Sequence, residues 1–250
     1  MDTIVIFDFG GQTTQLISRR IRDNGVFTRI VPGDSSVAEA AIDASVKGII
    51  LSGSPYSVYG EDAPTLDRSV LGLGVPVLGI CYGLQRLTQD LGGNVAKVHT
   101  REYGRAKLHF KRKHPLFEGV PEGFLSWMSH GDSIEKLAPG FEVVAESEHG
   151  IPAAIALDGG DPQATRKAPV MGIQFHPEVT HCDYGTEILR NFVYGICKAQ
   201  AGWKVEYYLQ EARELILTRV GGDADKAIQD PKTCKPVLLL ISGGVDSTVL

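Results

Sequence analysis

Short apolar segments, regularly separated by longer mixed segments, are the feature that most constrains how this chain can fold. Such segments, each long enough for one strand, lie at 3–8, 26–31, 48–51, 75–80 and 170–175. The segment at 75–80 is apolar throughout, as is usual for a strand buried on both faces of a parallel sheet. We therefore expect an α/β fold with a mostly parallel central sheet flanked by helices.

Helical spacing fills part of the intervals between these strands. Residues 12–24 form one predicted helix, which Gly25 ends. A second helix is expected at 186–199. In the first helix, one face is predicted to carry Leu16, Ile17 and Ile21, and the outward face Arg19, Arg20 and Arg22.

The remaining segments divide the chain into two predicted domains. Residues 95–157 have the pattern of antiparallel strands and hairpins, and 203–220 that of a helix with a charged face. A polar segment at 221–235 follows that helix. We place the boundary at about residue 201, which gives domains at 1–201 and 202–250.

Composition excludes several classes of protein. The formal net charge is -5, with 43% hydrophobic and 22% charged residues, so neither nucleic acid nor an anionic membrane is the expected main partner. We find no secretory signal and no apolar run long enough to span a membrane. The four cysteines are far apart, which predicts neither a disulfide framework nor a metal site and favours a reducing cytoplasm.

One strand runs directly into a candidate nucleophile. The stretch GICYG, residues 79–83, is the cysteine counterpart of the G-x-S-x-G elbow, in which a sharp strand-to-helix turn exposes the nucleophile. Cys81 would lie at a helix N-terminus, which favours a thiolate, and the N–H of Tyr82 would point toward an oxyanion. A buried structural cysteine is the alternative.

A candidate base follows another strand. His176 comes directly after the segment at 170–175, and Glu178 lies two residues further on. Because ligands gather at the carboxyl ends of parallel strands, Cys81 and His176 are expected to meet there. Glu178 would then orient the imidazole of a Cys–His–Glu triad.

Two further residues are candidates near these strand ends. Gly53 follows the segment at 48–51 and is a candidate second oxyanion donor, although an ordinary turn would also explain it. Gln85, one turn into the helix after Cys81, would either face the substrate or be exposed.

These motifs resemble a known family. The stretches GICYGLQ and QFHPE are similar to those of the class I, or triad, glutamine amidotransferases. The resemblance implies that Cys81 attacks the side-chain amide of glutamine to form a γ-glutamyl thioester, with His176 as base and then acid and Glu178 as its partner. It also implies that glutamine binds near Gln85 and the turn at Ser129 and His130.

Within that family, the stretches DFGGQTTQLISRRIRDNGV, WMSHGD, REYGRAKL and HPEVTHC resemble the amidotransferase half of GMP synthetases, over residues 3–208. The stretch SGGVDS then resembles the phosphate loop of their ATP pyrophosphatase domain. Its residues are Ser242, Gly243, Gly244, Val245, Asp246 and Ser247. The resemblance implies a homodimeric full-length enzyme that uses ATP, Mg²⁺ and ammonia to convert XMP to GMP.

The chain ends within that second α/β domain, so we expect it to be part of a longer protein and to carry only the glutaminase half-reaction. Two alternatives stay open. One is a different elbow hydrolase, such as a cysteine peptidase. The other is a folded but idle fragment.

Overall fold

The computed structural model describes residues 1–40, 42–161, 163 and 167–220. The chain divides into two units, Met1–Trp203 and Lys204–Leu250. In the second unit, the described residues include helix α4 (Val205–Val220), on which Leu209, Leu215 and Ile216 are exposed. The predicted phosphate loop at 242–247 lies outside the described residues. No helix in the described part of the chain is long and apolar enough to cross a membrane.

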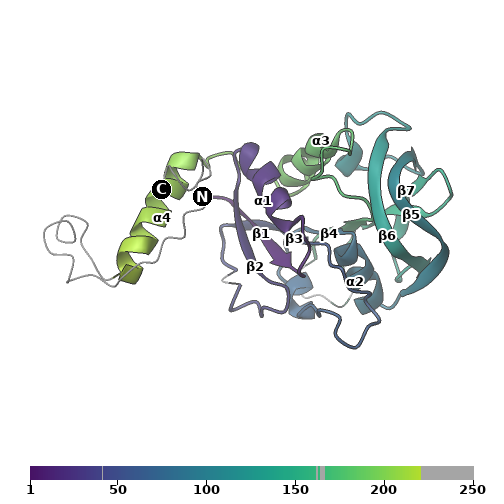
Figure 1. The fold of residues 1–250 in the computed structure, drawn as a ribbon, viewed down its shortest axis with the longest axis horizontal. Helices are drawn as coiled ribbons and strands as arrows, with labels where there is room; N and C mark the ends of the chain where they lie inside the picture. The colour runs from purple at the N-terminus through teal and green to yellow at the C-terminus, as the bar shows by residue number, and fades with distance from the viewer. Residues whose placement is uncertain (41, 162, 164–166, 221–250) are drawn as a thin grey trace, which may run out of the picture. The chain divides into compact units, whose positions relative to one another are not determined.

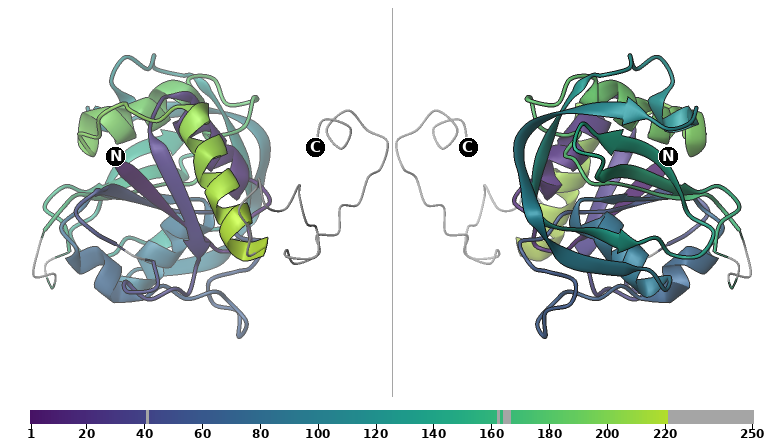
Figure 2. Two further views of the ribbon diagram at one scale, coloured as in Figure 1. Left: turned by 90° about the vertical axis from the view of Figure 1, so that its left-hand side faces the viewer. Right: turned by 90° about the vertical axis from the view of Figure 1, so that its right-hand side faces the viewer.

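The first unit is built on one mixed sheet with helices on both faces (Figures 1 and 2). Five neighbouring strands run parallel, in the order β2-β1-β3-β4-β9. They are β1 (Thr3–Asp8), β2 (Phe27–Pro32), β3 (Val46–Leu51), β4 (Val77–Ile80) and β9 (Val170–Ile173). The predicted α/β class with a parallel centre is thus confirmed.

The other part of the sheet is antiparallel, and it continues from β9 in the order β8-β7-β5-β6. These strands are β5 (Asn94–Phe110), β6 (Leu125–Lys136), β7 (Glu142–Ser147) and β8 (Pro152–Leu157). They account for the hairpin pattern expected at 95–157. The sheet is therefore parallel on one side of β9 and antiparallel on the other.

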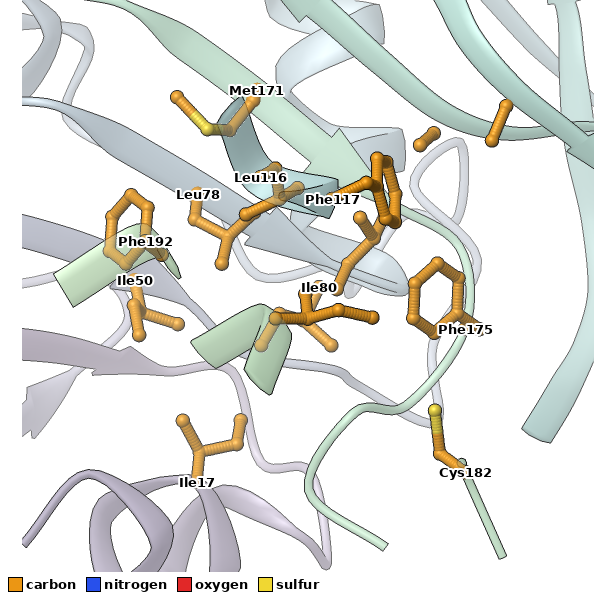
Figure 3. Close-up of a cluster of buried hydrophobic side chains, with 14 of the residues drawn as sticks. Ile17, Ile50, Leu78, Ile80, Leu116, Phe117, Met171, Phe175, Cys182 and Phe192 are labelled. Atoms are coloured by element: carbon orange, nitrogen blue, oxygen red, sulfur yellow. The ribbon is translucent and has the colours of Figure 1, made fainter. Parts of the chain in front are cut away.

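Alternating side chains of the strands build two hydrophobic cores, one on each face of the sheet. On β1, Ile4 and Ile6 face the core that also holds helices α1 (Thr14–Asp23) and α3 (Gly185–Arg190). Figure 3 shows side chains of that core, among them Ile17 of α1, the strand residues Ile50 and Leu78, and Phe192.

The opposite core holds Val5 and Phe7 of the same strand. Its helices are α2 (Tyr82–Asp90), through Leu84 and Leu87, and the 3₁₀ helix η1 (Arg68–Gly72). A second 3₁₀ helix, η2 (Pro115–Phe117), instead joins the first core. The sheet is therefore buried on both faces where α1 and α2 cover it.

The structure corrects the predicted orientation of α1. Ile17 and Ile21 are fully buried, but Leu16 is 40% exposed. Ser18 is buried instead, because its hydroxyl forms a 2.7 Å hydrogen bond with the hydroxyl of Thr28 on β2. A serine can be buried when its hydroxyl is hydrogen-bonded. Because serine is polar, the hydrophobic pattern of the sequence does not reveal such a buried position.

Two of the arginines predicted to point outward from α1 instead make tertiary hydrogen bonds. Arg20 donates from Nε to the carbonyl of Glu178 at 3.1 Å. Arg22 donates from Nε to the hydroxyl of Thr28 at 2.8 Å and lies over the rings of Phe27 and Trp203. Their long stems carry the charged heads off the helix to these partners.

Most element boundaries differ from the predictions by one or more residues, and two of these differences have a backbone cause. β4 begins at Val77 rather than residue 75, because Pro76 has no N–H to donate to a strand ladder. The last helix of the first unit ends at Arg190 as an α-helix and continues as the π-helix η3 (Asn191–Ile196), not to residue 199. Lys198, with φ of +55°, follows in a backbone conformation that no helix contains.

The orientation of α1 predicts unequal effects of two neighbouring substitutions on the stability of the first unit. Ile17→Ala removes a fully buried side chain and should lower the free energy of unfolding of the first unit by about 2–5 kcal/mol. Leu16→Ala, the matched control on the same helix, should change it by less than about 1 kcal/mol. Urea denaturation followed by circular dichroism measures both. Equal losses would contradict the observed orientation.

Candidate active site

The turn between β4 and α2 holds the Cys81 backbone in a strained conformation. β4 ends at Ile80 and α2 begins at Tyr82, and Cys81 between them has φ of +54° and ψ of -104°. Its N–H donates to the carbonyl of Ile173 at 2.8 Å, and its carbonyl accepts from the N–H of Gln85 at 3.2 Å. Such strain in a non-glycine residue persists only where the surroundings enforce it. The elbow predicted from the sequence is thus present.

The two glycines of the elbow are required by close backbone contacts. A Cβ at Gly79 would lie 2.5 Å from the carbonyl carbon of Gly83. A Cβ at Gly83 would lie 2.3 Å from the carbonyl oxygen of Leu51 on β3. These distances confirm that side chains at both positions would clash across the turn.

Three of the predicted residues meet at the carboxyl ends of β3, β4 and β9. A Cβ placed on Gly53 would lie 3.4 Å from Cε1 of His176 and 3.9 Å from Cβ of Cys81. The His176 backbone is held by its N–H, which donates to the carbonyl of Trp127 at 3.0 Å. The Gly53 backbone therefore lies beside both the sulfur-bearing residue and the imidazole.

Glu178 lies behind the imidazole of His176. Its Oε1 is 2.7 Å from Nδ1 of His176, and its side chain is fully buried. A buried carboxylate needs a charged or hydrogen-bonded partner, and His176 supplies one. The contact fixes the ring, so that Nε2 is the nitrogen left for chemistry.

The electrostatics of the site favour a protonated His176. Burial disfavours the imidazolium, but hydrogen bonds to Cys81 and Glu178, together with the negative charge of these groups, outweigh it. They raise the pKa of His176 from 6.5 to about 10. At neutral pH the ring therefore carries a proton. The imidazolium thus places a positive charge beside the sulfur of Cys81.

The site opens into a cavity of about 670 Å³, which is large enough for an amino acid. Cys81 and His176 lie in its wall with Gly53, and opposite elements contribute Ser129 and His130. The carbonyl of Ser129 lies 3.9 Å from the sulfur of Cys81. The structure thus brings Ser129 and His130 to the nucleophile, but they lie within strand β6, paired with β5, and not in the predicted turn.

The other two predicted residues have different places. Gln85 lines the cavity and is 4% exposed, so the alternative of an exposed helix position is wrong. The side chain of Tyr82 is buried away from the cavity, with its hydroxyl donating to the carbonyl of Pro64 at 2.5 Å and its ring beside Phe9. Tyr82 can therefore act at this site only through its backbone.

Sequence reasoning assigned no role to two residues of the site. Asp132 lines the cavity, and its carboxylate accepts hydrogen bonds from the hydroxyls of Ser57 at 2.5 Å and Tyr59 at 2.8 Å. Gln174 is 1% exposed and its Nε2 lies 3.5 Å from the sulfur of Cys81. The sequence could have indicated both, because Asp132 is the last residue of the motif WMSHGD and Gln174 is the first residue of the motif QFHPE.

The other described cysteines lie in the protein interior. Burial raises the pKa of Cys182 to about 12 and that of Cys197 above its usual range. Cys197 packs against β3, where a Cβ on Gly48 would meet its sulfur. Both are therefore packing residues of the interior. Among the described residues, no group of His, Cys, Asp and Glu side chains is arranged to hold a metal ion.

The protonation of His176 can be measured directly. Imidazole resonances followed by NMR should show His176 titrating near pH 10 in the wild-type protein. Glu178→Gln removes the carboxylate charge that holds the proton, so the pKa of His176 should fall by at least about one unit. His109, which is exposed, provides an internal reference that should not respond. A wild-type value near 6.5 would contradict the charge pair.

Comparisons with known proteins agree with this geometry. The family model described as glutamine amidotransferase class-I matches residues 5–196. The chain is 46% identical over 248 residues to the GMP synthase [glutamine-hydrolyzing] of Thermomicrobium roseum, covering 99% of this chain and 43% of that relative. The corresponding protein of Aquifex aeolicus is 45% identical, with coverages of 98% and 44%. The chain thus spans less than half the length of these relatives.

Solved structures give the same result. A candidate GMP synthase subunit from Thermoplasma acidophilum is 32% identical, with a TM-score of 0.62, and the match covers 80% of this chain and 95% of that chain. A glutamine amidotransferase from Methylobacillus flagellatus, 21% identical with a TM-score of 0.53 over 72% of this chain and 70% of that chain, shares the fold. With the elbow, the buried His–Glu pair and the family match over residues 5–196 in agreement, the chain belongs to the class-I glutamine amidotransferases.

Proposed function

We propose that the first unit hydrolyses the side-chain amide of glutamine through Cys81, His176 and Glu178, and releases ammonia. The observation that carries this proposal is the cysteine on the strained elbow, beside an imidazole that Glu178 holds at 2.7 Å. The cavity at the sulfur has the volume for a free amino acid. The two open alternatives, another elbow hydrolase and an idle fragment, become outcomes of the experiments below.

The first half of the reaction forms a thioester. The sulfur of Cys81 attacks the γ-carbonyl carbon of glutamine, and the carbonyl oxygen becomes an oxyanion. The imidazolium of His176 gives its proton to the amide nitrogen. The C–N bond then breaks, ammonia leaves, and a γ-glutamyl thioester remains on Cys81 with a neutral imidazole beside it.

The second half returns the site to its starting state. Neutral His176 takes a proton from water, whose oxygen attacks the thioester carbonyl. The C–S bond breaks and restores the thiolate beside the imidazolium, while glutamate leaves. Glu178 stays charged throughout and stabilises the imidazolium each time it forms.

The oxyanion requires hydrogen-bond donors on the side of the sulfur that faces the cavity. We assign them to the backbone N–H groups of Gly53 and Tyr82. Gly53 lies beside both Cys81 and His176, and Tyr82 follows the nucleophile at the first turn of α2. Removing one such donor in other enzymes slows the reaction by about 10²–10³-fold.

In a longer protein, we propose that this ammonia aminates XMP to GMP with ATP and Mg²⁺. Support comes from the relatives named GMP synthase [glutamine-hydrolyzing], of which the chain spans less than half. Residues 202–250 would begin the ATP pyrophosphatase domain, and residues 242–247 would hold phosphate, although that loop lies outside the described residues. The free thiols of Cys81, Cys182 and Cys197 fit a reducing compartment such as the cytoplasm.

Ammonia release from glutamine tests the proposed reaction. The wild-type chain should release ammonia, and Cys81→Ala should lower the rate by at least about 10³-fold because the nucleophile is lost. Cys182→Ala, at a buried cysteine outside the cavity, is the matched control. The assay is run alone and with the separately made remainder of a longer relative. If folded wild-type protein releases nothing in either case, the idle fragment becomes the correct account. If it cleaves peptides instead, the other elbow hydrolase does.

Gly53→Ala should separate chemistry from folding. The added methyl would lie 3.4 Å from the His176 ring and 3.9 Å from Cβ of Cys81, within the space where the γ-carboxamide must bind. We expect kcat/KM for glutamine to fall at least about tenfold while the unfolding midpoint changes little. Gly195→Ala, which has no atom within 4 Å of the new Cβ, is the control. Unchanged kinetics in Gly53→Ala would contradict the assigned place of the substrate amide.

A further inference from the structure

We infer that Gln174 is a fourth functional side chain of this site, whose amide N–H donates to the sulfur of Cys81 and stabilises the thiolate. The inference rests on the proposed role of Cys81 as the nucleophile. Gln174 directly follows β9 and is 1% exposed. Its own N–H donates to the carbonyl of Ala153 on β8 at 2.9 Å, which fixes the backbone from which the side chain extends.

A short chain of amide groups connects the sulfur to β6. Nε2 of Gln174 lies 3.5 Å from Sγ of Cys81, and Oε1 of Gln174 accepts from Nε2 of Gln85 at 3.1 Å. The same Nε2 of Gln85 donates to the carbonyl of Asp132 at 3.0 Å. Gln85 is 4% exposed, so both amide side chains are held away from solvent.

The orientation of the two amide side chains in this hydrogen-bond series is determined by the carbonyl of Asp132. The carbonyl of Asp132 can only accept, so the amide of Gln85 must turn its NH₂ group toward it. The other hydrogen of that NH₂ group then points to Gln174, which must present its oxygen. Gln174 is left with its own NH₂ group toward the sulfur. If the amide of Gln174 were reversed, its NH₂ group would face the NH₂ group of Gln85. Two buried donors would then lack an acceptor, and the free energy of removing them from water would not be recovered.

A fixed donor favours the charged form of the sulfur. A thiolate accepts hydrogen bonds, whereas a thiol has a proton to give, and a group hydrogen-bonded in its charged form is stabilised in that form. The carbonyl of Ser129, 3.9 Å from the sulfur, favours the thiol instead. The N–H of Gln174 therefore opposes that carbonyl and acts together with the imidazolium of His176.

Several titratable groups surround the sulfur and bear on any pH measurement. After β9 they are His176 and Glu178, and on β6 they are His130 and Asp132. Lys97 and Tyr103 of β5, with Tyr59 of the loop after β3, line the same cavity. All of these side chains are present in both the wild-type protein and a Gln174 variant. A difference between the pH curves of Cys81 alkylation of these two proteins therefore reports the loss of the Gln174 donor.

The pH dependence of Cys81 alkylation tests this inference without needing glutamine turnover. Iodoacetamide reacts with the thiolate, and mass spectrometry of the Cys81 peptide separates its rate from those of the other cysteines. Gln174→Met keeps the length and burial of the side chain but removes the donor. We expect the pH of half-maximal alkylation to rise by about one unit, which is a tenfold loss of thiolate at a given acidic pH.

A matched control separates the loss of the donor to Cys81 from the loss of any buried hydrogen bond. Thr88 of α2 is fully buried, and its hydroxyl donates to the carbonyl of Leu84 at 2.9 Å. Thr88→Val removes that buried hydrogen bond without touching the sulfur, so it should change stability but not the alkylation curve. Gln174→Glu should displace the curve further than Gln174→Met, because it puts a carboxylate beside the thiolate.

The outcomes distinguish this inference from the proposed function. A Gln174→Met curve that coincides with the wild-type curve, in a folded protein, would overturn the role of Gln174 and leave glutamine hydrolysis through Cys81 intact. Conversely, a curve displaced in Gln174→Met relative to wild type, together with a wild-type protein that releases no ammonia, would support the sulfur donor while contradicting the proposed glutamine hydrolysis by this chain.

Discussion

The backbone turn at Cys81 is the constraint on which the rest of the site depends. Its positive φ is held by hydrogen bonds to neighbouring strands: the Cys81 N–H donates to Ile173 of β9, and the N–H of Gly83 donates to Ser52 after β3. Those strands are in turn covered on both faces by hydrophobic cores. The hydrogen bonds and packing of the sheet therefore stabilise the strained backbone conformation of Cys81, which an unfolded chain would not adopt.

A second requirement is a positive charge beside the sulfur. The imidazole of His176 is nearly buried, and burial alone would deprive it of its proton. The hydrogen bond with Cys81 and the contact with Glu178, fully buried at 2.7 Å, together raise the pKa of His176 and reverse that balance. The Nε of Arg20 on α1 in turn donates to the Glu178 carbonyl. Helix α1 thus contributes to the site through the loop after β9, although it lies far from the nucleophile in the sequence.

The sequence predicted those parts of the site that follow from local patterns. Cys81, His176 and Gly53 each follow an apolar strand, and parallel strands bring their carboxyl ends to one edge, so their meeting could be deduced. Contacts between side chains far apart in the sequence could not. The bond of Asp132 to Ser57 and the burial of Ser18 in place of Leu16 depend on packing that no periodicity encodes.

Mass spectrometry of the chain, quenched in acid during incubation with glutamine, would test whether Cys81 is the covalent nucleophile. A γ-glutamyl adduct is expected on the Cys81 peptide, absent from Cys81→Ala and increased when the second half of the reaction is slowed. Release of ammonia from glutamine by a protein whose Cys81 never carries the adduct would contradict covalent catalysis at the elbow.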